Sequence, residues 1–172
     1  MTHRHKFATG HPLQAASKSS DCSPGQLAAV DVLIAENNEI NKCYVENVLG
    51  ELGLSYKTVD NGLAVVEAYK SSQPRIVLMD IAMPLSDGVE ATINIRRHEE
   101  QVKLHPVPII ALSANAIPGL RERYLKAGMN DYLLKPYSIE QISDKLEEWI
   151  LPRSDGAAPE FTQPKADMFA GD

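Results

Sequence analysis

The feature that most constrains the fold is a regular alternation of short apolar runs with longer amphipathic segments. The apolar runs are mostly rich in Val, Ile and Leu, and they lie at residues 30–35, 56–59, 75–79, 107–112 and 132–134. Strands that are buried on both faces of a parallel sheet have nearly continuous apolar sequences of this kind. The runs therefore predict five parallel strands.

Helical patterns separate these runs, at residues 38–52, 63–69, 87–98, 118–127 and 139–150. The first pattern carries apolar residues at every fourth position, which share one helix face: Ile40, Tyr44, Val48 and Leu52. In the third, Val89 and Ile93 are followed one turn later by Arg96 or Arg97. Pro118 suits the first turn of the fourth helix. The last pattern turns four residues inward: Ile142, Leu146, Trp149 and Ile150. Five strands alternating with five helices predict an α/β domain with helices on both faces of the sheet.

The two ends of the chain lack this periodicity. Residues 1–26 mix His, Ser, Lys, Gly and Pro, and residues 152–172 contain three prolines and four acidic residues. We expect both segments to be flexible tails, and residues 27–151 to form one domain.

Bulk properties exclude several classes of protein. The net charge of -6 argues against a nucleic-acid-binding surface, which needs a basic field. No apolar run approaches the roughly 20 residues that span a bilayer, and no secretory signal is present, so we expect no membrane insertion. The two cysteines have no metal-ligand spacing and fit a reducing compartment, which predicts a cytoplasmic protein.

Polar residues follow four of the predicted strands. Glu36 and Asn37 follow the first strand, Asp80 ends the third, Ser113 follows the fourth and Lys135 follows the fifth. In parallel α/β sheets, ligands and chemistry collect at the carboxyl ends of the strands. We therefore expect these side chains to converge on one edge of the sheet.

Such a set of side chains can support phosphoryl transfer. A strand-end carboxylate such as Asp80 can act as a nucleophile towards a phosphoryl donor. Glu36, Asp80 and the backbone carbonyl of Ala82 offer the oxygen ligands that Mg²⁺ prefers. Lys135 and the Ser113 hydroxyl can contact phosphoryl oxygens. One such residue alone could be purely structural, whereas all four at the proper strand ends favour a functional site.

Three segments give the sequence a resemblance to the receiver domains of two-component response regulators: DIAMPLSDG at 80–88, LSANA at 112–116 and GMNDYLLKP at 128–136. The sequences of these segments are most similar to those of receivers attached to hybrid sensor histidine kinases. The resemblance covers about residues 30–151. It implies a flavodoxin-like (βα)₅ fold with strand order 2-1-3-4-5. It also implies a phosphorelay module, not an enzyme, which accepts a phosphoryl group from a histidine kinase or a histidine phosphotransfer protein.

The resemblance also implies roles for individual residues. Asp80 is the expected phosphoacceptor, Ser113 the switch hydroxyl and Lys135 the phosphate-contacting lysine. Tyr132 is the aromatic residue expected to move with the switch, although an aromatic residue in a last strand can also serve packing alone. The bond between Lys135 and Pro136 is typically cis in this family.

The sequence departs from the family pattern at two positions. Asn37 stands where a second acidic metal ligand is usual, so we expect weaker Mg²⁺ binding unless Glu36 takes over that position. Ala82 places little side-chain bulk near the incoming phosphoryl group.

The alternative interpretation of the sequence is a pseudo-receiver that takes no phosphoryl group and acts as a constitutive docking module.

Phosphorylation is expected to act on one surface of the domain. Movement of Ser113 would pull residues 114–118 and open space for Tyr132, which would alter the fourth helix, the fifth strand and the fifth helix. We expect this surface to include four residues, Arg121, Arg123, Tyr124 and Lys126. It could bind a downstream protein, or its charges could simply be solvated. Formation of a homodimer is left open by the sequence.

Rival functions on related folds lack their characteristic residues. A flavin carrier would have a phosphate loop rich in Ser, Thr and Gly after the first strand, where residues 35–39 are instead acidic and bulky. An aspartyl phosphatase would have a second Asp at the position of Ala82. A nucleotide-binding switch would have a Gly-rich loop ending in Lys and Ser or Thr, and the sequence contains none.

Overall fold

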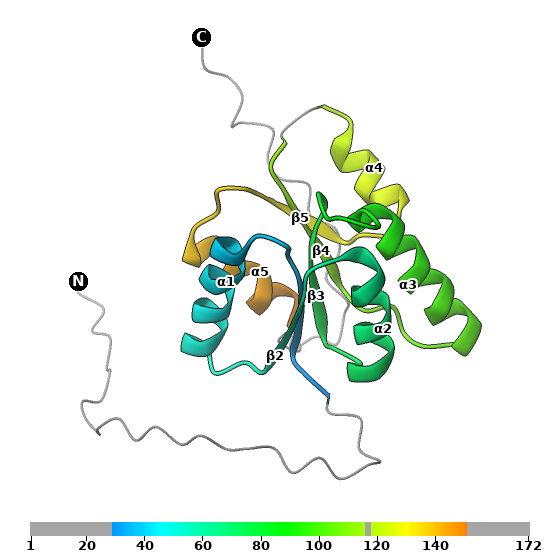
Figure 1. The fold of residues 1–172 in the computed structure, drawn as a ribbon, viewed down its shortest axis with the longest axis horizontal. Coiled ribbons are helices and arrows are strands. Elements are labelled where there is room, and N and C mark those ends of the chain that lie inside the picture. Colours follow the sequence, from blue (N-terminus) through cyan, green and yellow to red (C-terminus); the bar gives the residue numbers. More distant parts are fainter. Residues whose placement is uncertain (1–28, 116–117, 151–172) are drawn as a thin grey trace, which may run out of the picture.

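A computed structural model describes residues 29–115 and 118–150. The predicted tails, and the ends of the predicted domain at residues 27, 28 and 151, lie outside this range. Five parallel strands form one sheet (Figure 1): β1 Val32–Ala35, β2 Tyr56–Val59, β3 Ile76–Asp80, β4 Ile109–Ser113 and β5 Asp131–Leu134. The strand order is β2-β1-β3-β4-β5, so the predicted flavodoxin-like α/β fold is confirmed.

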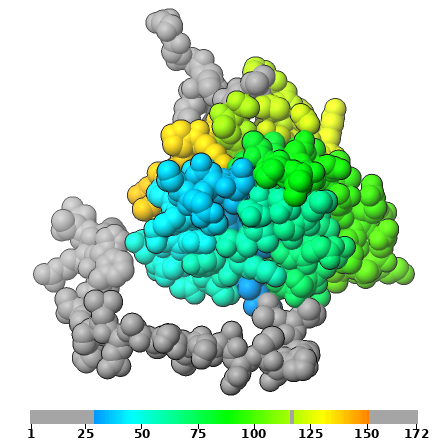
Figure 2. All heavy atoms as spheres, in the orientation of Figure 1, coloured from blue at the N-terminus to red at the C-terminus, as the bar shows by residue number. Residues whose placement is uncertain are grey.

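Five helices alternate with the strands: α1 Glu39–Glu51, α2 Gly62–Ser72, α3 Gly88–Val102, α4 Leu120–Lys126 and α5 Ile139–Ile150. Figure 1 shows α1 and α5 on one side of the sheet and α2 and α3 on the other. Figure 2 shows the blue and cyan atoms of the α1 region next to the teal atoms of the α2 region on the face in view. No helix in residues 29–115 and 118–150 combines the length and the apolar character needed to cross a bilayer.

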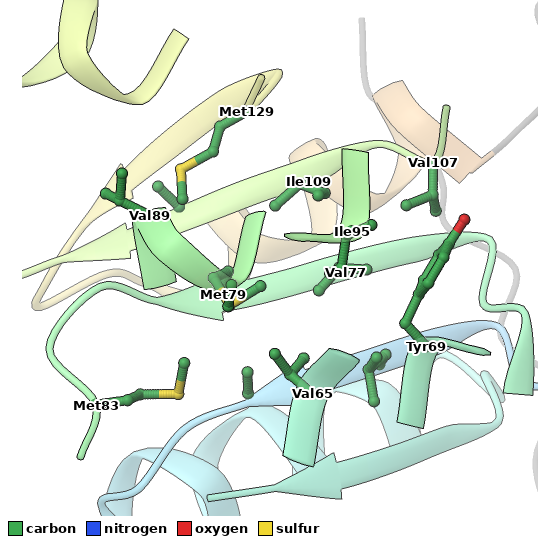
Figure 3. Packing of buried hydrophobic residues seen from close by; sticks show 14 of the residues in the cluster. Val65, Tyr69, Val77, Met79, Met83, Val89, Ile95, Val107, Ile109 and Met129 are labelled. Atoms are coloured by element: carbon green, nitrogen blue, oxygen red, sulfur yellow. The ribbon is translucent and has the colours of Figure 1, made fainter. Parts of the chain in front are cut away.

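Alternate residues of the central strands enter two separate cores. Leu33, Val77, Met79 and Ile109 point towards α2 and α3, where Figure 3 shows Val77, Met79 and Ile109 among Val65, Ile95 and Val89. Their neighbours along the chain, which include Ile34, Leu78 and Ile110, pack against α1 and α5. Strands β1 and β3 are buried along their whole lengths, which explains why their sequences are continuous apolar runs.

The predicted inner face of α1 is wrong at both ends. Val45, Val48 and Leu49 are buried, whereas Ile40 is 80% exposed and Leu52 is 42% exposed. Residues four apart advance by about 40° around a helix of about 3.6 residues per turn. A row with this spacing therefore drifts off the buried face within three steps.

Helix α4 begins later than the sequence suggests, and its buried face differs. It starts at Leu120, because Gly119 before it has a positive φ of 86° and caps the helix in the left-handed region. Pro118 therefore precedes the helix. Tyr124 was expected on the surface but is buried, at 4% exposure, and belongs to the core on the α2 and α3 side of the sheet.

Candidate functional site

The candidate site is built around one lysine that contacts two buried carboxylates. Lys135 Nζ lies 2.6 Å from Glu36 Oε2 and 2.8 Å from Asp80 Oδ2. Glu36 is fully buried and Asp80 is 5% exposed. Charge-assisted bonds this short are strong, and the ammonium offsets carboxylates that would otherwise be costly to bury.

Backbone amides hold the other oxygen of each carboxylate. Asn38 N–H donates to Glu36 Oε1 over 2.9 Å, and Ala82 N–H donates to Asp80 Oδ1 over 3.1 Å. Both acids are therefore anchored at two points. This fixes the orientation of Asp80 relative to the edge of the sheet.

The sheet topology brings these residues together from distant parts of the chain. Glu36 follows β1, Asp80 ends the neighbouring strand β3, and Lys135 follows β5. Lys135 N–H donates to the carbonyl of Ser113 over 2.8 Å, which extends the pairing of β4 with β5 by one more residue. The bond between Lys135 and Pro136 is cis, as the resemblance implies.

Close backbone packing shapes the loop after Asp80. A Cβ on Gly88 would lie 2.3 Å from the carbonyl oxygen of Asp80, and Gly88 N–H donates to the carbonyl of Ile81 over 3.1 Å. Only a residue without a side chain fits there. Gly88 therefore lets α3 start directly against the strand end that carries Asp80.

Ser113 ends β4 and takes part in a different set of contacts. Its hydroxyl lies 3.0 Å from the Tyr124 hydroxyl, where either oxygen can be the donor. It also accepts from Asn115 N–H over 3.2 Å and lies 3.3 Å from the Asn115 carbonyl. In this conformation the Ser113 hydroxyl is bound to α4 and to its own loop.

The remaining predicted residues lie around the site with less burial. Asn37, which directly follows Glu36, and Ala82, which lies two residues after Asp80, are both exposed. Tyr132 on β5 is half-buried and packs against the core cluster that contains Tyr124. The structure thus joins Glu36, Asp80 and Lys135 by direct contacts and places the other residues near them in sequence or in the sheet.

The donor atoms suit a hard divalent cation. Within residues 29–115 and 118–150, no group of three or more His, Cys, Asp and Glu side chains could hold a metal ion. Mg²⁺, however, is commonly held by one or two carboxylates, with water supplying most other ligands. Glu36 and Asp80 meet this requirement, since one ammonium contacts both.

The burial of two tyrosines near the site was not predicted from the sequence. Tyr137 is buried beside Tyr44, and burial, with the negative charges of Glu36 and Asp80, raises the pKa of its hydroxyl far above the usual range. Tyr124 was missed because it was expected on the surface. The positions of Leu120, Tyr124 and Ala127 at i, i+4 and i+7 could have identified a buried face.

Comparison with known proteins identifies the family. Residues 32–147 match the response regulator receiver domain. The sensor histidine kinase GacS of Pseudomonas protegens is 35% identical over 118 residues, which cover 69% of this chain and 13% of that protein. The peroxide stress-activated histidine kinase mak1 of Schizosaccharomyces pombe is 37% identical over 115 residues, covering 65% of this chain and 7% of that kinase. This chain therefore spans a small part of the length of these relatives.

Two solved structures support the same assignment. The receiver domain of the sensor histidine kinase PA1611 from Pseudomonas aeruginosa, with a magnesium ion coordinated in its active site cleft, is 39% identical with a TM-score of 0.63. That match covers 72% of this chain and 98% of the other. The second is a co-crystal structure of the Saccharomyces cerevisiae phosphotransfer protein Ypd1 and the receiver domain of its downstream response regulator Ssk1. Its match is 33% identical, with a TM-score of 0.67, and covers 72% of this chain and 90% of that chain. The chain therefore belongs to the response regulator receiver domains, which are phosphoacceptor signalling modules of two-component phosphorelays rather than enzymes.

Proposed function

We propose that Asp80 is the phosphoacceptor of this receiver domain. The observation that carries the proposal is the contact of Lys135 Nζ with both Asp80 and Glu36. Two carboxylates and one ammonium therefore lie together at the carboxyl edge of the sheet, and phosphoryl transfer to an acid uses groups of these kinds.

In the proposed reaction an oxygen of Asp80 attacks the phosphorus of the donor. A bond forms between that oxygen and phosphorus, and the bond from phosphorus to the donor's leaving atom breaks. Lys135 is close enough to contact an oxygen of a phosphoryl group on Asp80, since its ammonium already contacts Asp80. The Ser113 hydroxyl, at the end of the adjacent strand β4, can donate to another phosphoryl oxygen.

We further propose that Glu36, Asp80, Asn37 and the backbone carbonyl of Ala82 hold Mg²⁺. The ion would offset negative charge on the phosphoryl oxygens. The magnesium-bound receiver of PA1611 supports this part of the proposal. Because Asn37 contributes no charge, we expect the affinity to be lower than in a site with an acid there.

The donor is expected to be a histidine kinase or a histidine phosphotransfer protein. The resemblance to receivers of histidine kinases and to the Ypd1–Ssk1 structure supports this class of partner. We propose the surface of α4, β5 and α5 for a downstream protein partner or a homodimer.

The free thiol of Cys43 is exposed on α1, which fits a reducing compartment such as the cytoplasm.

Intact-mass spectrometry with a small-molecule phosphodonor tests the proposal. The protein should gain one phosphoryl group when Mg²⁺ is present and little or none when Mg²⁺ is chelated. Asp80→Asn should abolish the gain, whereas Asp60→Asn, which removes an exposed carboxylate directly after β2, should keep it.

The same experiment separates the two candidate functions. A folded protein that gains no phosphoryl group under any of these conditions would be a pseudo-receiver. Asn37 is the observation that favours this second candidate, since an amide stands where the family usually has an acid.

A further inference from the structure

The hydrogen bond between Ser113 and Tyr124 joins the proposed phosphoryl site to α4. The two hydroxyl oxygens are 3.0 Å apart, and both residues are buried, Ser113 at 3% and Tyr124 at 4% exposure. Ser113 lies at the end of β4, while Tyr124 lies in the middle of α4. The bond is therefore a buried polar link between the sheet edge and the helix.

This bond competes with the role proposed for Ser113. A serine hydroxyl has a single hydrogen to donate. In the resting state that hydrogen can go to the Asn115 carbonyl, 3.3 Å away, with Tyr124 then donating to Ser113. When Ser113 moves to donate to a phosphoryl oxygen on Asp80, the bond between the two hydroxyls breaks if the movement carries Ser113 Oγ away from α4. Tyr124 would then hold a buried hydroxyl without this partner, and an unmade hydrogen bond of that kind is costly.

Other contacts of α4 are weaker candidates for such a link. Arg123 Nη2 lies 3.9 Å from Asp87 Oδ2, but both side chains are about half exposed or more, at 61% and 49%. Exposed ion pairs of this kind contribute little to stability. Tyr132 was expected to couple to the switch. It packs half-buried against the same core cluster, whereas Tyr124 bonds Ser113 directly.

We propose that Tyr124 is a positioning residue that holds Ser113 in the resting state, so that phosphorylation of Asp80 frees α4 by breaking the bond between their hydroxyls. The inference rests on the proposed function of Asp80 and adds Tyr124 as the residue that couples Ser113 to α4. The two arrangements of Ser113 form a two-state equilibrium, which the bond to Tyr124 biases towards the resting state.

Removing one hydroxyl tests the inference. Tyr124→Phe deletes the bond and keeps the packing of the ring, so the population with Ser113 free should rise. We expect phosphorylation by a small-molecule donor to become several-fold faster, as the loss of one hydrogen bond from the resting state implies. Tyr69→Phe is the matched control, because it also removes one buried, hydrogen-bonded hydroxyl from a tyrosine of the same core, and it should leave the rate unchanged.

A double-mutant cycle shows whether Tyr124 acts through Ser113. In a Ser113→Ala background the Tyr124→Phe change should have no further effect on the rate, because the bond is already absent. NMR shifts of the α4 amides should also change alike in the two single variants. Urea unfolding of each variant confirms that it is folded.

Each outcome decides between the inference and its alternatives. Equal acceleration by Tyr124→Phe with and without Ser113 would mean that Tyr124 acts through packing, and it would overturn the inference alone. An unchanged rate in Tyr124→Phe, or an equal response to Tyr69→Phe, would also overturn it. If the parent protein gains no phosphoryl group at all, the proposed function fails and this inference falls with it.

Discussion

Lys135 brings a single positive charge to a pair of carboxylates, so the three side chains carry a net charge of about -1 when all are ionised. A divalent cation can compensate this excess negative charge. Because the amide of Asn37 is neutral, Glu36 and Asp80 supply all the carboxylate charge that attracts the ion. The charge at position 37 is therefore a sensitive variable of the site.

Asn37→Asp should tighten Mg²⁺ binding. A unit charge at about 4 Å contributes roughly 1–4 kcal/mol at the dielectric values of water and of protein surfaces, and the exposure of Asn37 favours the lower end. We expect about a ten-fold gain in affinity by isothermal titration calorimetry. Asn37→Gln, which keeps the charge unchanged, and Asn94→Asp, which adds a charge on α3, should leave the affinity near its parent value. An unaltered affinity in Asn37→Asp would refute the weakened-site hypothesis.

The central cluster of the site could be predicted from the sequence, but its surroundings could not. The strand-end rule correctly brought Glu36, Asp80 and Lys135 to one edge, because parallel strands fix that placement without side-chain detail. The Tyr124 contact depends on which face of α4 turns inward. The spacing of Leu120, Tyr124 and Ala127 contains this signal, but in a seven-residue helix it is a single row of residues with no second turn to reinforce it.

At the scale of elements, one buried polar network connects α2 and α3 to the segment just before β4. Glu99 is 2% exposed, and its oxygens accept from Tyr69 OH over 2.9 Å, Val107 N–H over 2.8 Å and Arg96 over 2.7 Å. Figure 3 shows the Tyr69 ring beside Val107. The network lies in a different part of the molecule from Asp80, so we assign it a structural role.

Arg96 extends this network to the loop before β5. It donates to the carbonyls of Gly128 and Val107, both over 2.8 Å, and to Asn130 Oδ1 over 2.9 Å. The sequence left open whether Arg96 or Arg97 follows the inner face of α3. The structure turns Arg96 inward, because these backbone carbonyls and Glu99 give its guanidinium partners.

Arg96→Met should strongly destabilise the protein. It leaves the buried Glu99 carboxylate without its cation, and breaking a buried pair in this way typically costs about 3–5 kcal/mol. Arg97→Met, at the exposed neighbouring position, should change the free energy of unfolding by no more than about 0.5 kcal/mol. Urea unfolding of both variants measures the difference, and similar losses would contradict the structural role of the network.

For the whole molecule, the alternation of strands and helices was enough to predict a parallel sheet covered on both faces. The strand order followed from the family resemblance, since periodicity says nothing about which strands are neighbours. Helix ends were less predictable. α3 continues to Val102 and ends where Lys103 adopts a positive φ of 57°, a backbone conformation that the sequence does not reveal.

Global stability should fall in alkaline solution because of two buried tyrosines. Burial raises the pKa of Tyr69 and Tyr137 well above the usual range, with Glu99 adding to the effect on Tyr69. Below about pH 10 both hydroxyls are protonated in the folded and the unfolded chain. Above it, only the unfolded chain loses these protons, so each tyrosine lowers the free energy of unfolding by up to about 1.4 kcal/mol per pH unit.

Urea unfolding between pH 8 and pH 11.5 measures this dependence. Tyr69→Phe and Tyr137→Phe should each show a shallower decline than the parent, after the difference at pH 8 is subtracted. A decline as steep in both variants as in the parent would mean that other groups cause the alkaline loss of stability.

The most direct measurement for the central claim is the location of the phosphoryl group on the chain. Borohydride reduces an acyl phosphate on an aspartate to homoserine, which peptide mass spectrometry can assign to one position. After treatment with a phosphodonor and Mg²⁺, the account predicts homoserine at position 80 and at no other position. Homoserine elsewhere, or none in a folded protein exposed to the donor, would contradict the assignment of Asp80 as the phosphoacceptor.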